Sequence, residues 1–375
     1  MSRSGRIRQR DLAFDLGTGL EDRTQTMVAT VRMRPSGHEF VVEPGETLLE
    51  SALRSGLSVR YRCNNGTCGE CRAKLISGGP PEAQPHDYVF TEQEKTDGMF
   101  LLCRTTASSD LTIEALEAKG SEDIPHQKIT TTVCKLVALS NDIMELQLKT
   151  PRSKTLWFLA GQHVNLGVNG LSASPRAIAS CPCNGRRLDF HIERRPGDPF
   201  SDYIFSGLKM RDTVEVEGPA GKLVLDESAA RPLVFVAYGT GFAAIKSLIE
   251  HAISLDLKQV VRLYWMVRRP GAHYLGNFCR SWQEVIDDYM YVPLVSDLGR
   301  GATGNELLSV DVSSMPRAER DLLQACMQLV MDIPDLSGFD VYVGGVCQSL
   351  TSVRELLTRH GLPSDRLFID DLECL

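Results

Sequence analysis

The sequence predicts a multidomain protein in which a small mixed α/β domain, an antiparallel β-barrel and a doubly wound α/β domain follow one another. Three observations predict this order. Four cysteines with a distinctive spacing occupy the first third, short alternating runs fill the middle, and apolar strands alternate with helices in the last third. At 375 residues the chain is long enough for two or three domains.

The composition is that of an ordinary globular protein. Apolar residues make up 42% of the chain and charged residues 24%, and the formal net charge is −7. A negative net charge gives no indication of the basic surface that binds nucleic acid. The sequence has no apolar run of the ~18 residues that a membrane span needs, and it lacks the apolar segment of a signal peptide. We therefore expect a cytoplasmic protein whose cysteines are metal ligands or reduced thiols.

A hairpin and a capped helix open the first domain. Residues 1–26 show no sustained period, and we expect them to form a mobile tail. The alternating runs VATVRMR and EFVVE then predict two antiparallel strands, and Thr47 with Glu50 predicts a capping box at the start of a helix. We expect this domain to cover residues 27–116 and a polar linker to cover 117–128.

The four cysteines of this domain have the spacing of a plant-type 2Fe-2S site. Cys63, Cys68 and Cys71 follow the pattern C-x4-C-x2-C, and Cys103 supplies a distant fourth thiol after an apolar run. Asparagines and glycines between them tolerate the positive φ angles that a tight loop requires. Structural zinc prefers two close cysteine pairs, which this spacing does not match. The pattern therefore predicts an iron-sulfur cluster held by these four residues.

Residues 129–228 predict an antiparallel barrel of about six strands, because short alternating runs such as IMELQLKT and LDFHIER are separated by turns. Three segments are candidates for cofactor contacts. They are LWFLAGQHVNL at 156–166, SPRAIASCP at 174–182, and a loop that leads into a short helix at Phe200 and Ser201. Backbone N–H groups at a helix start can hold a diphosphate. Taken alone, each segment is better explained as an ordinary strand edge or helix cap.

Residues 229–375 predict the doubly wound domain. The apolar run LVFVA precedes Gly239, Thr240 and Gly241, and an amphipathic helix follows them. Glycines at such a turn let the backbone approach a pyrophosphate at the helix N-terminus, although the pattern alone is a weak signal. The segment 299–335 is longer than a tight connection needs, which suggests either a partner contact or an insertion.

The chain resembles known redox proteins in its domains and in their order. Over residues 27–116 it is similar to the plant-type ferredoxins, on EPGETLLESALRSGLSVRYRC and LLCRTTASSDLTIE, which implies a β-grasp-like 2Fe-2S ferredoxin domain. Over residues 27–375 it resembles the ferredoxin-NADP reductase superfamily, specifically the three-domain reductases of bacterial oxygenases. The same layout occurs in the reductases that serve CDP-6-deoxyhexulose dehydration. The resemblance implies an FAD-binding barrel followed by an NAD(P)-binding domain.

The resemblance also implies a function. Electrons from NADH or NADPH would pass through FAD and the 2Fe-2S cluster to a partner, expected to be a terminal oxygenase, and no side chain need act as acid or base. The implied flavin and nicotinamide contacts are Arg176, Ala177, Ile178, Ser180, Phe200, Ser201, Gly239, Thr240, Gly241 and Phe242. The choice between NADH and NADPH stays open. Arg268 and Arg269 can meet a 2′-phosphate or lie on a solvated turn.

The flavin motif departs from the family pattern Arg-x-Tyr-Ser. Ser174 stands at the arginine position, Arg176 at the tyrosine and Ala177 at the serine, so the stacking aromatic ring and the hydroxyl are both replaced. Arg176 can still meet phosphate or lie over the flavin ring by its guanidinium plane.

The nicotinamide motifs depart as well. Tyr238 replaces the first glycine of the turn motif and Ala244 its proline, while Gly344 stands at the family's late cysteine position, three residues before Cys347. We expect Cys347 to be a small packed thiol. These departures motivate an alternative function, in which the protein is a ferredoxin-like carrier or accessory subunit with an impaired flavin or nicotinamide site.

Overall fold

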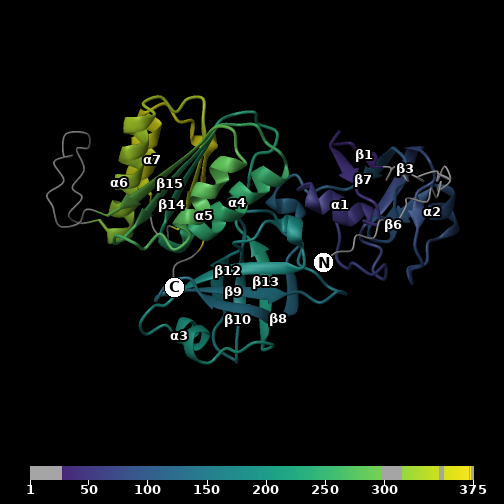
Figure 1. Ribbon diagram of the computed structural model, residues 1–375, viewed down its shortest axis with the longest axis horizontal. Coiled ribbons are helices and arrows are strands. Elements are labelled where there is room, and N and C mark those ends of the chain that lie inside the picture. Colours follow the sequence, from purple (N-terminus) through teal and green to yellow (C-terminus); the bar gives the residue numbers. More distant parts are fainter. Residues whose placement is uncertain (1–27, 297–314, 346–349, 371, 373–375) are drawn as a thin grey trace, which may run out of the picture.

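The computed structural model describes residues 28–296, 315–345, 350–370 and 372. Within them each third of the chain builds its own sheet. Figure 1 shows the N-terminal domain at the right, the barrel below the centre and the α/β domain at the upper left. The predicted tail at 1–26 and the predicted packed thiol of Cys347 lie outside the described residues.

The N-terminal domain is a five-stranded mixed sheet covered by helix α1, in the order β2-β1-β7-β3-β5. Its elements are β1 (Ala29–Arg34), β2 (Glu39–Val42), α1 (Leu48–Arg54), β3 (Arg72–Gly78), β4 (Glu82–Ala83), α2 (Glu92–Thr96), β5 (Met99–Leu101), the 3₁₀ helix η1 (Leu102–Arg104), β6 (Thr105–Thr106) and β7 (Leu111–Ala115). The predicted hairpin and the capping box are confirmed, because β1 pairs antiparallel with β2 and the N–H of Glu50 donates to Thr47 Oγ1 at 3.2 Å.

The middle domain is a six-stranded antiparallel sheet in the order β11-β10-β13-β8-β9-β12, which confirms the predicted strand number. Its elements are β8 (Gln127–Ala138), β9 (Ile143–Lys149), β10 (His163–Gly167), β11 (Ser174–Ala177), η3 (Pro182–Asn184), β12 (Arg187–Glu193), α3 (Pro199–Ser206) and β13 (Thr213–Ala220). The N–H of Ala179 donates to the carbonyl of Asp189 at 2.7 Å. This bond ties the chain just after the edge strand β11 to the other edge strand, β12.

The C-terminal domain is a five-stranded parallel sheet in the order β16-β15-β14-β17-β18. Its elements are β14 (Leu233–Tyr238), the turn η4 (Gly239–Gly241), α4 (Phe242–Ser254), β15 (Val261–Val267), α5 (Gly276–Ser281), β16 (Tyr289–Val295), α6 (Arg317–Asp332), β17 (Asp340–Gly344), α7 (Thr351–Arg359) and β18 (Leu367–Ile369). Figure 1 shows α6 and α7 on one side of the sheet and α4 and α5 on the other.

Both faces of this sheet are buried, as the continuous apolar run of β14 predicts. Val234 and Val236 pack into the core beneath α6 and α7, whereas Phe235 and Ala237 pack beneath α4. The described part of the segment 299–335 contains α6, a crossover helix whose buried side covers the sheet. That part is therefore neither an irregular insertion nor an unusually long loop. None of the described helices combines the length and the apolar character that crossing a bilayer requires.

Candidate functional site

The cysteine loop and the turn after β5 bring the four predicted thiols together in two pairs. Hydrogen bonds join the side chains of Cys63 and Cys68, and those of Cys71 and Cys103. A 2Fe-2S cluster takes two thiolates on each iron, so this pairing fits a binuclear cluster. Within the described ranges, no three Cys, His, Asp or Glu side chains are grouped to hold a single metal ion.

Backbone N–H groups of the loop point at the sulfur atoms. Burial alone would raise the pKa of the Cys63 thiol, but hydrogen bonds from Cys68 and from the N–H groups of residues 65, 67 and 68 lower it to about 6. The N–H of Gly66 donates to the Cys103 sulfur. Such donors stabilise negative charge on sulfur, which a cluster ligand requires. The loop is thus arranged to receive an anionic iron-sulfur group.

Glycines at two loop positions are required by the turn and by its neighbours. Gly66 and Gly69 have φ angles of 80° and 74°, as predicted. A Cβ atom on Gly69 would also fall 2.1 Å from the ring of Tyr88. Both the backbone and the packed ring therefore exclude a side chain there.

One extended segment of the barrel domain links the cysteine loop to the predicted flavin segment. Thr155 donates its N–H to the carbonyl of Arg62 at 2.8 Å, and Asn64 donates its N–H to the carbonyl of Arg152 at 3.1 Å. Further along, the N–H of Ile178 donates to the carbonyl of Gln162 at 3.0 Å. The apolar side chains of Trp157 and Leu159, between these two ends, pack in the N-terminal core. The two sites are thus held on one rigid connection.

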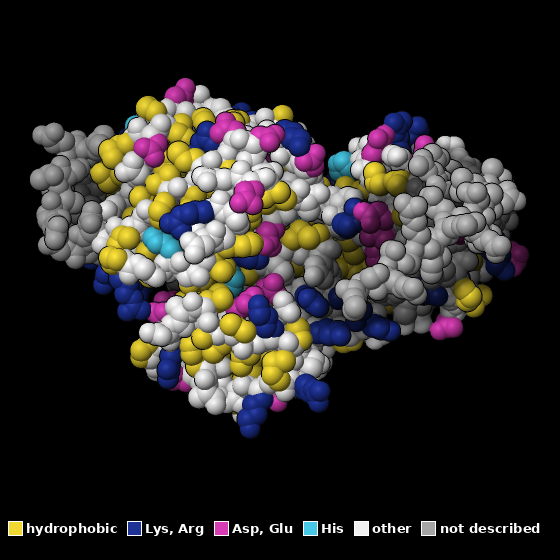
Figure 2. Space-filling model, in the orientation of Figure 1, with side chains coloured by type: hydrophobic (Ala, Val, Ile, Leu, Met, Phe, Trp, Pro, Cys, Tyr) yellow, Lys and Arg dark blue, Asp and Glu magenta, His cyan; other side chains and the backbone are white. Residues whose placement is uncertain are grey.

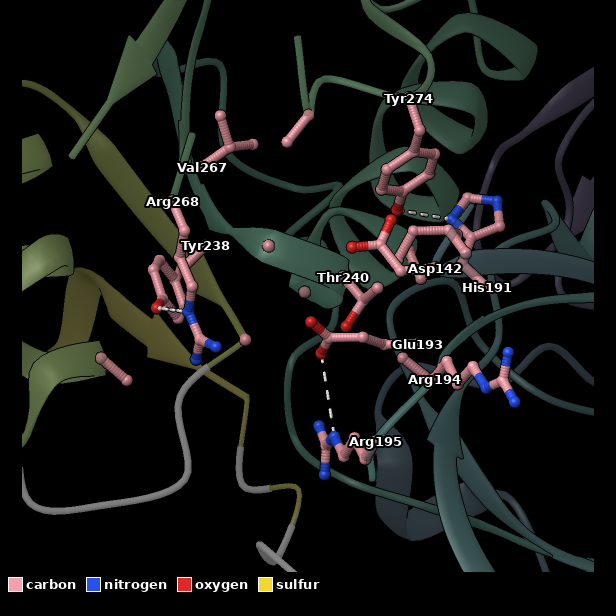
Figure 3. A pocket seen from close by; sticks show the side chains of 18 of the residues that line it. Asp142, His191, Glu193, Arg194, Arg195, Tyr238, Thr240, Val267, Arg268 and Tyr274 are labelled. Atoms are coloured by element: carbon pink, nitrogen blue, oxygen red, sulfur yellow. Dashed lines mark hydrogen bonds and ion pairs between the residues drawn. The ribbon is translucent and has the colours of Figure 1, made fainter. Parts of the chain in front are cut away.

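A cavity of about 600 Å³ lies between the barrel and the C-terminal edge of the parallel sheet. The ends of β11 and β12 line one side, and β14, η4 and the chain after β15 line the other. In Figure 3, Glu193 and Arg195 of the barrel face Tyr238 and Arg268 across the opening, and the Arg194 side chain is directed away from them. Its size is within the usual range of a cofactor site, and it lies where parallel sheets bind their ligands.

The cavity is rich in arginine. Six arginines line it, against the three carboxylates Asp142, Glu193 and Asp370. One of these arginines, Arg176, is only 12% exposed, and its nearest carboxylate, on Asp198, lies 3.6 Å away. Burial and the charge of Arg195 lower the Arg176 pKa to about 10. Because a buried cation in cationic surroundings is stabilised by an anion, this corner fits a cofactor phosphate.

The predicted flavin contacts divide into cavity and packing positions. Arg176 and Ala177 line the cavity, whereas Ile178 is fully buried in the barrel core. Ser180 accepts the N–H of Asp189 at 3.2 Å, so its hydroxyl holds the strands together.

The start of α3 is occupied by its own cap. The N–H of Phe200 donates to Asp198 Oδ1 at 3.1 Å, which corrects the expectation that this N–H is available to a diphosphate. The Phe200 ring instead lies 4.8 Å from the Arg176 guanidinium and supports it from below. Ser201 uses its hydroxyl to bind the backbone of Arg195. These two residues shape the site through Arg176 and Arg195.

The turn after β14 lies at the cavity as predicted. Gly239, Thr240 and Gly241 all line it, and the α4 N-terminus follows directly. Phe242 does not line the cavity but is fully buried and stacked on Trp265, with ring centroids 3.9 Å apart. Its role is therefore to anchor the turn from behind, because its ring is directed into the domain core.

The tyrosine that replaces the first glycine of the turn motif belongs to a buried polar network. The Tyr238 hydroxyl accepts the Arg268 Nε–H at 2.7 Å and donates to Asp321 Oδ2 at 3.0 Å. Asp321 is buried, and its other carboxylate oxygen accepts the Ser296 hydroxyl at 2.6 Å. The network fixes Arg268 at the cavity wall. The structural role of Tyr238 was not predicted from the sequence, because the comparison with the family motif showed only that a tyrosine replaces the first glycine.

Sequence reasoning also missed His191 and Tyr274, which come from different domains. His191 Nδ1 lies 3.0 Å from the Tyr274 hydroxyl, and both residues line the cavity (Figure 3). Burial and the nearby Lys246 lower the His191 pKa to about 3, so the ring is neutral. The alternation of β12 places His191 on the strand face opposite the apolar barrel core, and no spacing relates it to a tyrosine 83 residues away.

Charges on the visible surface are mixed. Figure 2 shows Asp and Glu interspersed with Lys and Arg, and a group of Lys and Arg where the barrel approaches the N-terminal domain. The visible face has no uniformly basic surface of the kind that binds nucleic acid.

Comparison with known proteins identifies two domain families. Residues 31–108 match the 2Fe-2S iron-sulfur cluster binding domain, and residues 130–225 match the oxidoreductase FAD-binding domain. The first range covers most of the first sheet but ends before β7, and the second covers most of the barrel strands. The N-terminal boundaries predicted at 27 and 116, and the barrel boundaries at 129 and 228, stay predictions.

Several similar proteins match this chain over most of its length. The CDP-6-deoxy-L-threo-D-glycero-4-hexulose-3-dehydrase reductase of Yersinia pestis is 32% identical over 348 residues, which are 92% of this chain and 98% of the relative. The propane 2-monooxygenase reductase component of Rhodococcus jostii is 26% identical over 349 residues, 91% of this chain and 90% of the relative. The crystal structure of an Amycolatopsis cytochrome P450 reductase has a TM-score of 0.55 at 24% identity and covers 92% of this chain and 99% of its own.

Proposed function

Because the chain belongs to the family of three-domain reductases that join a 2Fe-2S domain to FAD-binding and nicotinamide-binding domains, we propose that it supplies electrons from NAD(P)H to a separate oxygenase. When bound, FAD accepts a hydride from nicotinamide and releases its electrons singly, and a 2Fe-2S cluster accepts one electron at a time. The protein supplies position and electrostatics. No acid or base on the chain is needed.

Three groups of residues hold the cofactors. Cys63, Cys68, Cys71 and Cys103 bind the cluster. Arg176, supported by Phe200, neutralises phosphate on the barrel side of the cavity. On the opposite side, the turn at 239–241 offers backbone N–H groups and the positive end of α4 to the nicotinamide dinucleotide.

The hydrogen-bonded connection between the two sites carries this proposal. The carbonyl of Arg62 and the N–H of Asn64 flank Cys63 and bind the segment that begins at Arg152, and the same segment ends at Gln162 against the flavin motif. A rigid link of this kind keeps donor and acceptor at a constant separation, which favours a reproducible electron-transfer rate. A carrier that received electrons only from another protein would have no need of such a link.

The departures from the flavin and nicotinamide motifs do not remove the features that bind these cofactors. The helix N-terminus is main chain, and Arg176 brings a cation to the position of the lost aromatic ring. The carrier alternative predicts that the cavity binds no FAD. Cofactor content separates the two functions.

The test is the visible spectrum of the purified full chain, followed without oxygen as NADH or NADPH is added. The reductase is expected to contain stoichiometric FAD and two irons per chain, and both the flavin band and the iron-sulfur absorption should bleach. An iron-sulfur spectrum without flavin, unchanged by either coenzyme, would establish the carrier alternative and overturn the proposal.

A second experiment addresses the acceptor. The reduced protein is mixed with a purified terminal oxygenase, and coenzyme consumption that depends on the oxygenase substrate is measured. Substrate-dependent consumption supports an oxygenase partner. Transfer to a sugar-nucleotide dehydrase and to no oxygenase would overturn that part alone, since the Yersinia relative is named for such an enzyme.

A further inference from the structure

Cys181 and Cys183 lie on one 3₁₀ turn where the three domains meet. The turn, η3, directly follows the flavin segment of the barrel, and it packs against α1 of the N-terminal domain and α4 of the C-terminal domain. The Cys181 sulfur lies 3.7 Å from the hydroxyl oxygen of Ser254, at the end of α4. Neither cysteine belongs to the cluster set, and neither lines the cavity.

The two thiols are in direct contact. The Cys183 N–H donates to the Cys181 sulfur at 3.2 Å, and a hydrogen bond joins the two thiol groups. Pro182 between them has its φ fixed by the ring, so the turn holds this arrangement in advance. Adjacent sulfurs on a preformed turn can form a disulfide without bringing distant parts of the chain together.

The pair has an accessible member and a sheltered member. Cys183 is partly exposed, and its hydrogen bond with Cys181 lowers its pKa, which favours the reactive thiolate. Cys181 is buried, and this burial raises its pKa. An exposed low-pKa thiol next to a second, resolving thiol is the usual arrangement of a cysteine that reacts with peroxide.

The turn also contacts Tyr61, which lies just before the cysteine loop. Gly185, two residues after Cys183, packs so closely that a Cβ atom on it would fall 1.9 Å from the Tyr61 hydroxyl oxygen. Tyr61 is buried, lies two residues before Cys63 and forms a hydrogen bond with the side chain of Thr155. Because this contact has no free space, a movement of η3 would displace Tyr61 and the neighbouring cysteine loop.

We propose that Cys181 and Cys183 form a peroxide-reactive dithiol, whose oxidation to a disulfide by a hydroperoxide displaces η3 from Tyr61 and slows electron transfer to the 2Fe-2S cluster. This modification site rests on the proposed function, because its effect is on the transfer step of that reductase. It would restrict the delivery of electrons when peroxide accumulates.

The chemistry balances with hydrogen peroxide as oxidant. The Cys183 sulfur attacks one peroxide oxygen, the O–O bond breaks, and a sulfenic acid and one water result. The Cys181 sulfur then attacks the sulfenic sulfur, an S–S bond forms, and the second water leaves. The two thiols lose two electrons and two protons, and the peroxide gains them.

The disulfide changes the shape of the turn because it closes a ring through only three residues. In the reduced turn, the Asn184 N–H donates to the carbonyl of Cys181 at 3.3 Å, and the Cys183 N–H donates to a thiol sulfur. Closing the ring rotates both side chains and strains this backbone. A strained, partly exposed disulfide is readily reduced again, so the modification is reversible.

The experiment uses the full chain with FAD and cluster bound, treated with a few equivalents of hydrogen peroxide. Mass spectrometry of the peptide that contains residues 181–183 is expected to show the loss of two hydrogen atoms. NAD(P)H-dependent reduction of cytochrome c, which depends on the cluster, should fall about tenfold, while ferricyanide reduction by the flavin stays unchanged. Dithiothreitol should restore both the peptide mass and the rate.

Two variants and a matched control separate this effect from damage to the cluster. Cys181→Ser and Cys183→Ser should keep their cytochrome c rate after peroxide. Cys134→Ser should lose it as the wild type does, because Cys134 is an equally half-buried thiol that bonds to Gln147 in the barrel. The iron-sulfur absorbance is recorded in every sample.

Three results would overturn the inference: no mass loss in the peptide, a disulfide without change in cytochrome c reduction, or equal inhibition of Cys181→Ser and the wild type. Failure of the proposed function has a different signature. The untreated protein would then reduce neither acceptor with either coenzyme, and the inference about the transfer step would fall with it.

Discussion

Gly241 and Gly345 bring two turns of the nicotinamide domain into backbone contact, such that a Cβ atom on Gly241 would fall 2.1 Å from the Gly345 Cα. The first turn follows β14 and the second follows β17, two neighbouring parallel strands. Their contact closes the floor of the cavity, where both residues are part of the lining. The glycine at 241 is therefore needed for this close approach.

Replacing Gly241 by alanine is expected to push the two turns apart and to lower NAD(P)H–ferricyanide activity by at least about tenfold, since displacement of a binding turn misplaces the coenzyme. Steady-state rates with both coenzymes provide the measurement. Gly338→Ala is the control, because a Cβ atom at Gly338 meets nothing within 4 Å. Equal activity of both variants would show that the contact does not position the coenzyme.

Gly185→Ala is expected to displace the Tyr61 side chain and to slow cytochrome c reduction without changing ferricyanide reduction. The added methyl group overlaps the Tyr61 hydroxyl, and Tyr61 precedes the proposed cluster ligand Cys63 by two positions. Tyr61→Phe removes the overlapping atom, so the double variant should recover part of the lost rate. A fall in both activities of the single variant would indicate general misfolding instead.

Replacing Cys103 by serine should abolish cytochrome c reduction and the iron-sulfur absorbance while leaving the flavin and its ferricyanide reduction intact. Cys103 pairs with Cys71, and without it one iron loses a thiolate ligand. Iron and sulfide analysis together with the two rates gives the result. Cys134→Ser should change neither the iron and sulfide content nor the two rates, because that thiol lies in the barrel. Retention of a full cluster by Cys103→Ser would assign the fourth ligand elsewhere.

Arg176→Gln is expected to weaken FAD binding about tenfold, the loss of one charge-assisted contact. The residue is buried at the cavity, and burial followed by the charge of Arg195 lowers its pKa, so a phosphate beside it would stabilise the charged guanidinium. Fluorescence of released FAD measures the dissociation constant. Arg187→Gln, at the exposed start of β12, should leave the constant unchanged. Unaltered affinity of Arg176→Gln would place the phosphate away from this corner.

The free energy of unfolding should decrease as the pH is lowered, because His191 is buried. Burial lowers its pKa in the folded protein to about 3, against an ordinary value of 6.5. Between these values the unfolded chain binds a proton that the folded chain excludes. This residue's contribution to stability is therefore fully present above pH 6.5 and is lost progressively as pH falls toward 3, by ~1.4 kcal/mol per unit.

Denaturant unfolding of the wild type and of His191→Gln at pH 7 and pH 5 tests this linkage. The variant lacks the ionisable ring, so its free energy of unfolding should decrease less between the two pH values. The same decrease in both proteins would assign the acid sensitivity to other groups.

Several features were predictable because they depend on local pattern. The capping box at Thr47 and Glu50 is written in residues three positions apart, and the turn geometry of Gly66 follows from the tolerance of glycine for positive φ. The alternation of buried and exposed residues gave the strands of the barrel, and the continuous apolar run gave β14 as a strand buried on both faces.

The cavity was less predictable because its walls come from separate domains. Arg269 pairs with Asp142 across 127 positions, and His191 meets Tyr274 across 83. Neither pair has a spacing that a sequence pattern can reveal. The direction of the Phe242 ring was hidden for a related reason, since an aromatic ring at a helix start can face a ligand or the core, and here it stacks on Trp265 in the core.

The sequence by itself determined the order of three kinds of domain and the four thiols suited to a cluster, because these rest on periodicity and spacing along the chain. The class of protein followed from the resemblance to a known family. The tertiary structure alone decided which side chains share the cavity, why a tyrosine can stand at position 238, and how the cluster loop is seated against the barrel. Those outcomes depend on side chains brought within a few ångströms by packing between domains, and packing is a property of the folded chain rather than of any local pattern.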